Sequence, residues 1–104
     1  RESPLDPGRG AAHTDDLPYV FGTLDAPGSY SGTDKRAREI SETMIAAFAG
    51  MAHKGRPGLT RWSSYELPSR DTLFIGQDRT ELRSDPRQWE RELWATGPYI
   101  QPGS

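Results

Sequence analysis

The sequence predicts an α/β arrangement whose core is not complete within the chain. One long amphipathic helix, one strand and one shorter helix follow each other over residues 34–54, 71–76 and 85–96. A lone strand has unpaired edges, so we expect this one to join a sheet built elsewhere. Only 33% of the 104 residues are hydrophobic, whereas a domain of this size must bury roughly two thirds of its unfolded surface. The apolar faces are therefore expected to pack on something outside the chain.

The helix over residues 34–54 has the clearest pattern. Asp34 is suited to the N-cap, and Gly55 follows the last basic turn as a C′ glycine. Apolar residues recur at helical spacing and form one face: Ile40, Met44, Ala47, Phe48 and Met51.

The second half of the chain contains the expected strand and the last helix. The run "DTLFIG" over 71–76 is apolar and is followed by the turn "GQDR". Asp85 and Pro86 resemble an N-cap and a first helical residue, which predicts a helix over 85–96. Its apolar stripe consists of Trp89, Leu93 and Trp94.

Composition excludes several classes of function. The net charge is −2, with no basic block of the kind that nucleic-acid binding requires. No apolar run reaches the ~18 residues of a membrane span. There is no cysteine, so thiol metal sites and disulfides within the chain are excluded and the cellular compartment stays open. No cofactor motif is present.

A histidine-containing segment, residues 10–24, follows a proline-containing loop over residues 1–9. It begins "GAAHTDDLPYVFG" and places His13 before two acids and an apolar run. We expect that run (Leu17, Tyr19, Val20, Phe21) to be buried and to hold the loop in place. A metal site would need at least three ligands, and His13, Asp15 and Asp16 form only a weak candidate. His13 is either a polar loop residue or a general acid/base, since imidazoles titrate near neutrality.

The segment around His13 resembles the histidine segment of the type-B carboxylesterases, the family that includes the cholinesterases. In that family a glycine stands three residues before the catalytic histidine, as Gly10 does here, and an acid stands three after it, as Asp16 does. A "YVFG"-like run follows, matching residues 19–22.

The resemblance continues along the chain to about residue 94. "ISE" at 40–42 begins a similar helix, and "FAGMAHKGRPG" resembles the next element with one or two residues inserted before Gly55. Trp62 and Tyr65 match an element in which Ser63 replaces a proline. "RDTLFI" and "DPRQWERELW" match the late strand and the final helix.

The resemblance implies that residues 1–104 are the C-terminal portion of one α/β-hydrolase domain. His13 would be the general acid/base of a Ser-His-Glu/Asp triad, and Asp16 a buried supporting acid, while Asp15 is expected to be solvated. The nucleophilic serine, the triad acid and the oxyanion loop would lie on a larger partner chain. A small-molecule ester would be the substrate, with no cofactor and no metal.

Two alternatives stay open. The same scaffold could cleave amides or carbamates, because these reactions use the same groups. Some members of the family have lost catalytic residues and act as binding or adhesion modules. A third hypothesis, an independent small interaction domain, is disfavoured by the thin core and the single strand.

Overall fold

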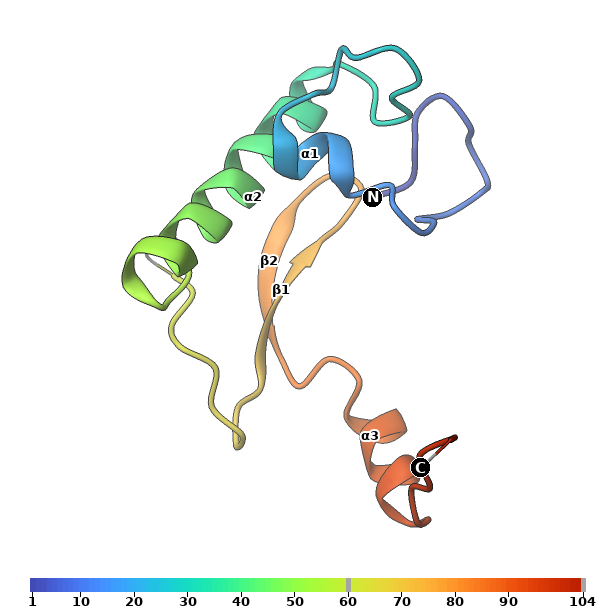
Figure 1. Ribbon diagram of the computed structural model, residues 1–104, viewed down its shortest axis with the longest axis vertical. Coiled ribbons are helices and arrows are strands. Elements are labelled where there is room, and N and C mark those ends of the chain that lie inside the picture. Colours follow the sequence, from blue (N-terminus) through green and yellow to red (C-terminus); the bar gives the residue numbers. More distant parts are fainter. Residues whose placement is uncertain (60, 104) are drawn as a thin grey trace.

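The chain folds around one long helix in the computed structural model, which describes residues 1–59 and 61–103 (Figure 1). A short helix, α1 (Leu17–Phe21), precedes this long helix, α2 (Lys35–Lys54). Two strands follow, β1 (Asp71–Ile75) and β2 (Thr80–Ser84), and then a last helix, α3 (Gln88–Ala95). The helix predicted over 34–54 is confirmed, with Asp34 at the N-cap position and Gly55 left-handed at its end (φ 68°).

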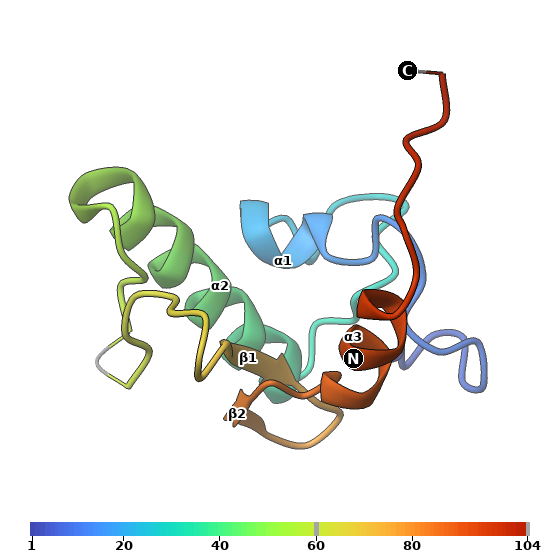
Figure 2. The same ribbon diagram turned by 90° about the horizontal axis from the view of Figure 1, so that it is seen from below.

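The small core lies where α1 packs beside α2, as both views show (Figure 1 and Figure 2). Tyr19, Ala37 and Ile40 are buried, with Leu24, Met44 and Ile75 packed against them. Two hydrogen bonds hold Tyr19 in place. The Tyr19 hydroxyl donates to the Ser31 carbonyl (3.2 Å), and the Ser41 hydroxyl donates to the Tyr19 carbonyl (2.7 Å).

Only part of the apolar run after His13 is buried. Tyr19 is 5% exposed and Val20 is half-buried, but Leu17 and Phe21 are exposed, at 46% and 72%. Within this chain only Tyr19 of the four is buried, so the burial of Leu17 and Phe21 against something outside the chain stays a prediction. A five-residue helix has one inward face, and Tyr19 occupies it.

The predicted strand is not alone. β1 pairs with β2 in an antiparallel hairpin in which Asp71 lies opposite Ser84 and Ile75 opposite Thr80. The expectation of a single unpaired strand over 71–76 was therefore wrong. β2 carries Glu81 and Arg83, which pair with each other at 2.6 Å, and Arg83 stacks over the Phe74 ring across the hairpin at 3.5 Å. Both outer edges of this two-stranded sheet remain unpaired among the described residues.

The last helix begins later than residue 85. β2 runs to Ser84, and the Asp85 N–H donates to the Arg70 carbonyl at 3.3 Å, next to the hairpin. Asp85 adopts a left-handed conformation (φ 44°), so it cannot act as the predicted N-cap. Its carboxylate instead pairs with Arg91 of α3 at 2.6 Å.

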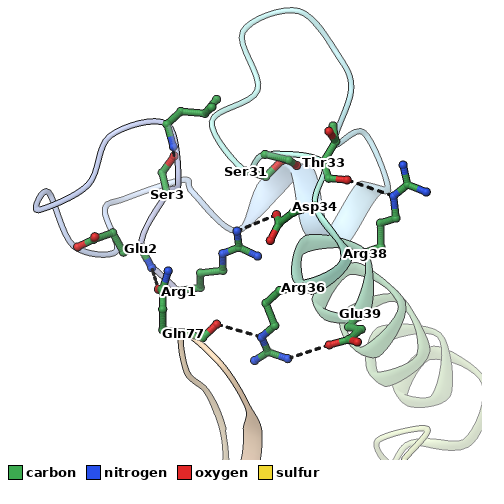
Figure 3. A network of polar contacts seen from close by, with 12 residues as sticks. Arg1, Glu2, Ser3, Ser31, Thr33, Asp34, Arg36, Arg38, Glu39 and Gln77 are labelled. Carbon is green, nitrogen blue, oxygen red and sulfur yellow. Dashed lines mark hydrogen bonds and ion pairs between the residues drawn. The ribbon is translucent and has the colours of Figure 1, made fainter.

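Arginine side chains attach the hairpin to the rest of the chain (Figure 3). Arg36 of α2 donates to the carbonyls of Gly76 (3.0 Å) and Gln77 (3.2 Å) and to the Thr80 hydroxyl (3.0 Å). Arg1 bonds Asp34 at 2.8 Å, and its α-amino group donates to the Ile75 carbonyl at 3.4 Å. The turn of the hairpin is thus held by charged groups.

Much apolar surface remains uncovered. The accessible surface is 7949 Å², against about 5,800 Å² for a typical folded protein of this mass. The radius of gyration is 16.2 Å, against about 13 Å. α3 stands away from α2 at the far end of the long axis (Figure 1), and Trp89, Leu93 and Trp94 are all exposed. The two predicted apolar stripes therefore exist, but α3 leaves its own entirely bare.

An apolar groove lies where α2 faces β1. Its volume is about 190 Å³, and its lining includes Phe48, Met51, Trp62 and Leu73. No helix among the described residues is long and apolar enough to cross a membrane.

We expect the isolated 104-residue chain to lack a cooperative thermal transition, because only three apolar side chains are buried among the described residues. Differential scanning calorimetry and far-ultraviolet circular dichroism would show broad, shallow melting. A sharp transition with the enthalpy of a 104-residue domain would contradict this expectation.

Candidate functional site

His13 lies at the corner of a tight turn just before α1. The Asp15 N–H donates to the Ala12 carbonyl at 3.2 Å, so residues 12–15 close a four-residue turn. Thr14, at the third position, has a φ of 69°, which is the pattern of a type II turn. His13 itself is exposed, and its imidazole has no hydrogen-bond partner among the described residues. The structure therefore presents this side chain outward.

Asp15 holds the turn from the inside. One carboxylate oxygen accepts the Ala12 N–H at 3.0 Å, and Arg9 donates to both oxygens at 2.8 Å. The Ala12 N–H first, and then the Arg9 guanidinium, hold the pKa of the Asp15 carboxyl below its usual range. The charged form thus stabilises the turn above about pH 4, and this contribution is lost as the pH falls through the lowered pKa. The expectation that Asp15 is solvated was wrong, since its side chain is 19% exposed.

Asp16 occupies the N-cap position of α1. Its carbonyl accepts the N–H groups of Tyr19 and Val20, both at 3.1 Å. Its side chain makes no capping bond and is exposed, and no described residue bonds its carboxylate. The Asp16 side chain is therefore accessible to groups from outside this chain, and its supporting role stays a prediction.

The first nine residues brace the histidine turn from behind. Glu2 accepts the Gly10 N–H at 3.2 Å, and its own N–H donates to the Gln77 side chain at 3.0 Å. A pocket of about 170 Å³ lies behind the turn, and its lining includes Arg1, Ala12, Asp15 and Asp16 but not His13. The Arg1 side chain is buried there, and two of its guanidinium nitrogens have no partner among the described residues.

Among the described residues, no serine hydroxyl and no carboxylate bonds the imidazole of His13. The hydroxyls of Ser29 and Ser31 bond each other at 2.8 Å, and Ser3 bonds the Tyr30 carbonyl. Among the described residues no group of three His, Cys, Asp or Glu side chains could hold a metal ion. Within the described part of the chain, the site thus consists of one histidine on a braced turn.

Comparison with curated proteins identifies esterases. No protein-family profile matches the chain. It is 28% identical over 86 residues to the para-nitrobenzyl esterase of Bacillus subtilis, and this alignment covers 79% of the chain and 17% of the esterase. It is 32% identical over 102 residues to the bile salt-activated lipase of Mus musculus, covering 89% of the chain and 16% of the lipase. The chain thus spans about a sixth of the length of these relatives.

Solved structures give the same result. A thermophilic para-nitrobenzyl esterase superposes with a TM-score of 0.72 at 27% identity, covering 88% of the chain and 20% of the esterase. The carboxylesterase EST55 of Geobacillus stearothermophilus superposes with a TM-score of 0.69 at 25% identity, covering 86% and 20%. The bare helix faces and the two-stranded sheet are what a portion of a larger fold would show. The chain is a relative of the carboxylesterases and corresponds to the C-terminal portion of their α/β-hydrolase fold.

Proposed function

We propose that this chain supplies the general acid/base histidine of a carboxylic-ester hydrolase. The observation that carries the proposal is the position of His13, exposed on a braced turn that immediately precedes α1. An imidazole needs access to a nucleophile on one side and to an acid on the other. His13 is presented outward with neither nitrogen engaged by a described residue, so both partners can come from elsewhere.

The remaining catalytic groups belong to a larger portion of the same enzyme. Its serine attacks the ester carbonyl while His13 accepts the hydroxyl proton, forming a tetrahedral intermediate whose oxyanion is held by backbone N–H groups. The intermediate collapses as His13 protonates the leaving alcohol, which leaves an acyl-serine. His13 then takes a proton from water, the hydroxide attacks the acyl carbon, and the proton returns to the serine oxygen as the acid departs.

The larger portion would also cover the bare surfaces of this chain. The groove between α2 and β1 exposes Phe48 and Met51, and α3 exposes Trp94 at 79%. Exposed apolar patches of this kind mark interaction surfaces. In this proposal Asp16 also faces the larger portion of the enzyme. Its carboxylate accepts hydrogen bonds from that portion and supports the loop that carries His13.

Replacing His13 with alanine in the assembled enzyme should lower kcat by about 10⁴-fold, as the loss of a triad residue does. KM and thermal stability should change little, because the imidazole is exposed and forms no hydrogen bond with a described residue. Steady-state ester hydrolysis measures this. His53→Ala is the matched control, since His53 is also exposed but lies in the last turn of α2, and it should retain wild-type turnover. A His13→Ala enzyme with a tenth of wild-type kcat would remove His13 from the mechanism.

A serine-directed phosphonate should label the complex of this chain with the larger portion stoichiometrically, and peptide mapping should place the label on the larger portion. The isolated chain should not react. Label on Ser29 or Ser31 would overturn the assignment of the nucleophile. A complex that binds the chain but never reacts would favour the binding-module alternative.

A further inference from the structure

The turn that carries His13 contains a strained residue. Thr14 has a φ of 69°, in the left-handed region that glycine enters readily and that β-branched residues rarely adopt. The hydrogen bond from the Asp15 N–H to the Ala12 carbonyl closes the turn in this conformation. A left-handed conformation of this kind persists only where the surrounding structure enforces it.

Asp15 provides that enforcement. Its backbone N–H and its carboxylate close two hydrogen bonds on the same residue, Ala12, at 3.2 and 3.0 Å. The pair of bonds encloses His13 and Thr14 between two fixed residues. Arg9 then fixes the carboxylate by donating to both oxygens at 2.8 Å, so the carboxylate cannot rotate away without breaking a charged pair.

Arg9 is itself held on two further sides. It pairs with Asp6 at 3.3 Å and lies over the Tyr30 ring at 5.3 Å. The loop over residues 1–9 and the segment around Tyr30 therefore both transmit their positions to the carboxylate. The two acids after His13 differ in their bonds to described residues. The Asp15 carboxylate accepts hydrogen bonds, whereas Asp16 accepts them only through its backbone carbonyl.

We propose that Asp15, gripped by Arg9, is a positioning residue that holds the strained Thr14 turn and thereby sets where the His13 imidazole stands. This inference rests on the proposed function of His13. A general base must lie within hydrogen-bond reach of the proton it accepts, and a displacement of 1 Å can cost about 100-fold in rate. Asp15 acts through the backbone of the turn and does not touch the reacting atoms.

The test compares Asp15→Ala with the double variant Thr14→Gly/Asp15→Ala in the assembled enzyme. Removing the carboxylate should lower kcat by roughly 10- to 100-fold with KM nearly unchanged. Glycine at position 14 should restore at least half of the lost factor on a logarithmic scale, because it adopts the left-handed conformation without strain. A residue that merely stabilised the protein would not be rescued by a neighbour that changes only the φ preference.

Hydrogen exchange provides a readout that does not depend on catalysis. The backbone amide of residue 15 should exchange about tenfold faster or more in the Asp15→Ala variant than in the wild type. Glycine at position 14 should restore the protection of this amide. Asp25→Ala, the same change at an exposed loop carboxylate, should alter neither kcat nor this amide. If the Asp15→Ala enzyme fails to assemble, Arg9→Gln should reproduce the kcat loss in a milder form.

The outcomes separate the two proposals. Wild-type kcat in Asp15→Ala alongside an inactive His13→Ala enzyme would overturn the positioning role alone. So would a loss in Asp15→Ala that glycine at position 14 leaves uncorrected. Full activity in His13→Ala would overturn the proposed function, and the exchange data would still decide whether Asp15 holds the turn.

Discussion

The guanidinium of Arg36 donates three hydrogen bonds into the turn of the β1–β2 hairpin, and the rest of the arrangement depends on this contact. In a typical domain a shared apolar core would join helix to sheet. Here only Ile75 of the hairpin packs against the small core of Tyr19, Ala37 and Ile40. Charged hydrogen bonds have strict geometry, so they fix the orientation of the hairpin even though little apolar area is buried. The groove between α2 and β1 stays open beneath this polar bridge.

The sequence was most informative where one physical signal dominates. α2 could be predicted closely because its apolar spacing, its N-cap Asp34 and its C′ Gly55 all agree. β2 was missed because Glu81 and Arg83 look like a solvated turn when read alone. Those charges are satisfied by each other and by the Phe74 ring across the hairpin, a partnership that periodicity does not reveal. The start of α3 was misplaced for the same reason, since Asp85 serves the hairpin and Arg91 instead of a cap.

The candidate site shows a similar division. His13 could be singled out because an exposed histidine between small residues and an apolar run is chemically conspicuous, and the resemblance to carboxylesterases gave it a role. The partners of its neighbours could not be read from the sequence. Which of two adjacent acids is gripped depends on where the loop over residues 1–9 folds, and Arg9 reaches Asp15 only because the chain turns back on itself. Nothing in the local pattern ranks one acid above the other.

The hydrogen bond from Arg36 to the Gly76 carbonyl also determines how readily the chain between them can gain or lose residues. It closes a loop of 40 residues, whose entropic cost grows only with the logarithm of that length. Adding one or two residues between α2 and β1 changes this cost by less than roughly 0.1 kcal/mol, since a full doubling adds only about 0.6 kcal/mol. Insertions or deletions of one or two residues in this stretch therefore cost almost no loop-closure free energy, as long as Arg36 and its hydrogen-bond partner are kept. The limit comes from close approaches at two glycines. An added Cβ on Gly50 would lie 2.2 Å from the backbone of Gly58, and one on Gly58 would lie 2.2 Å from the Ala46 carbonyl oxygen.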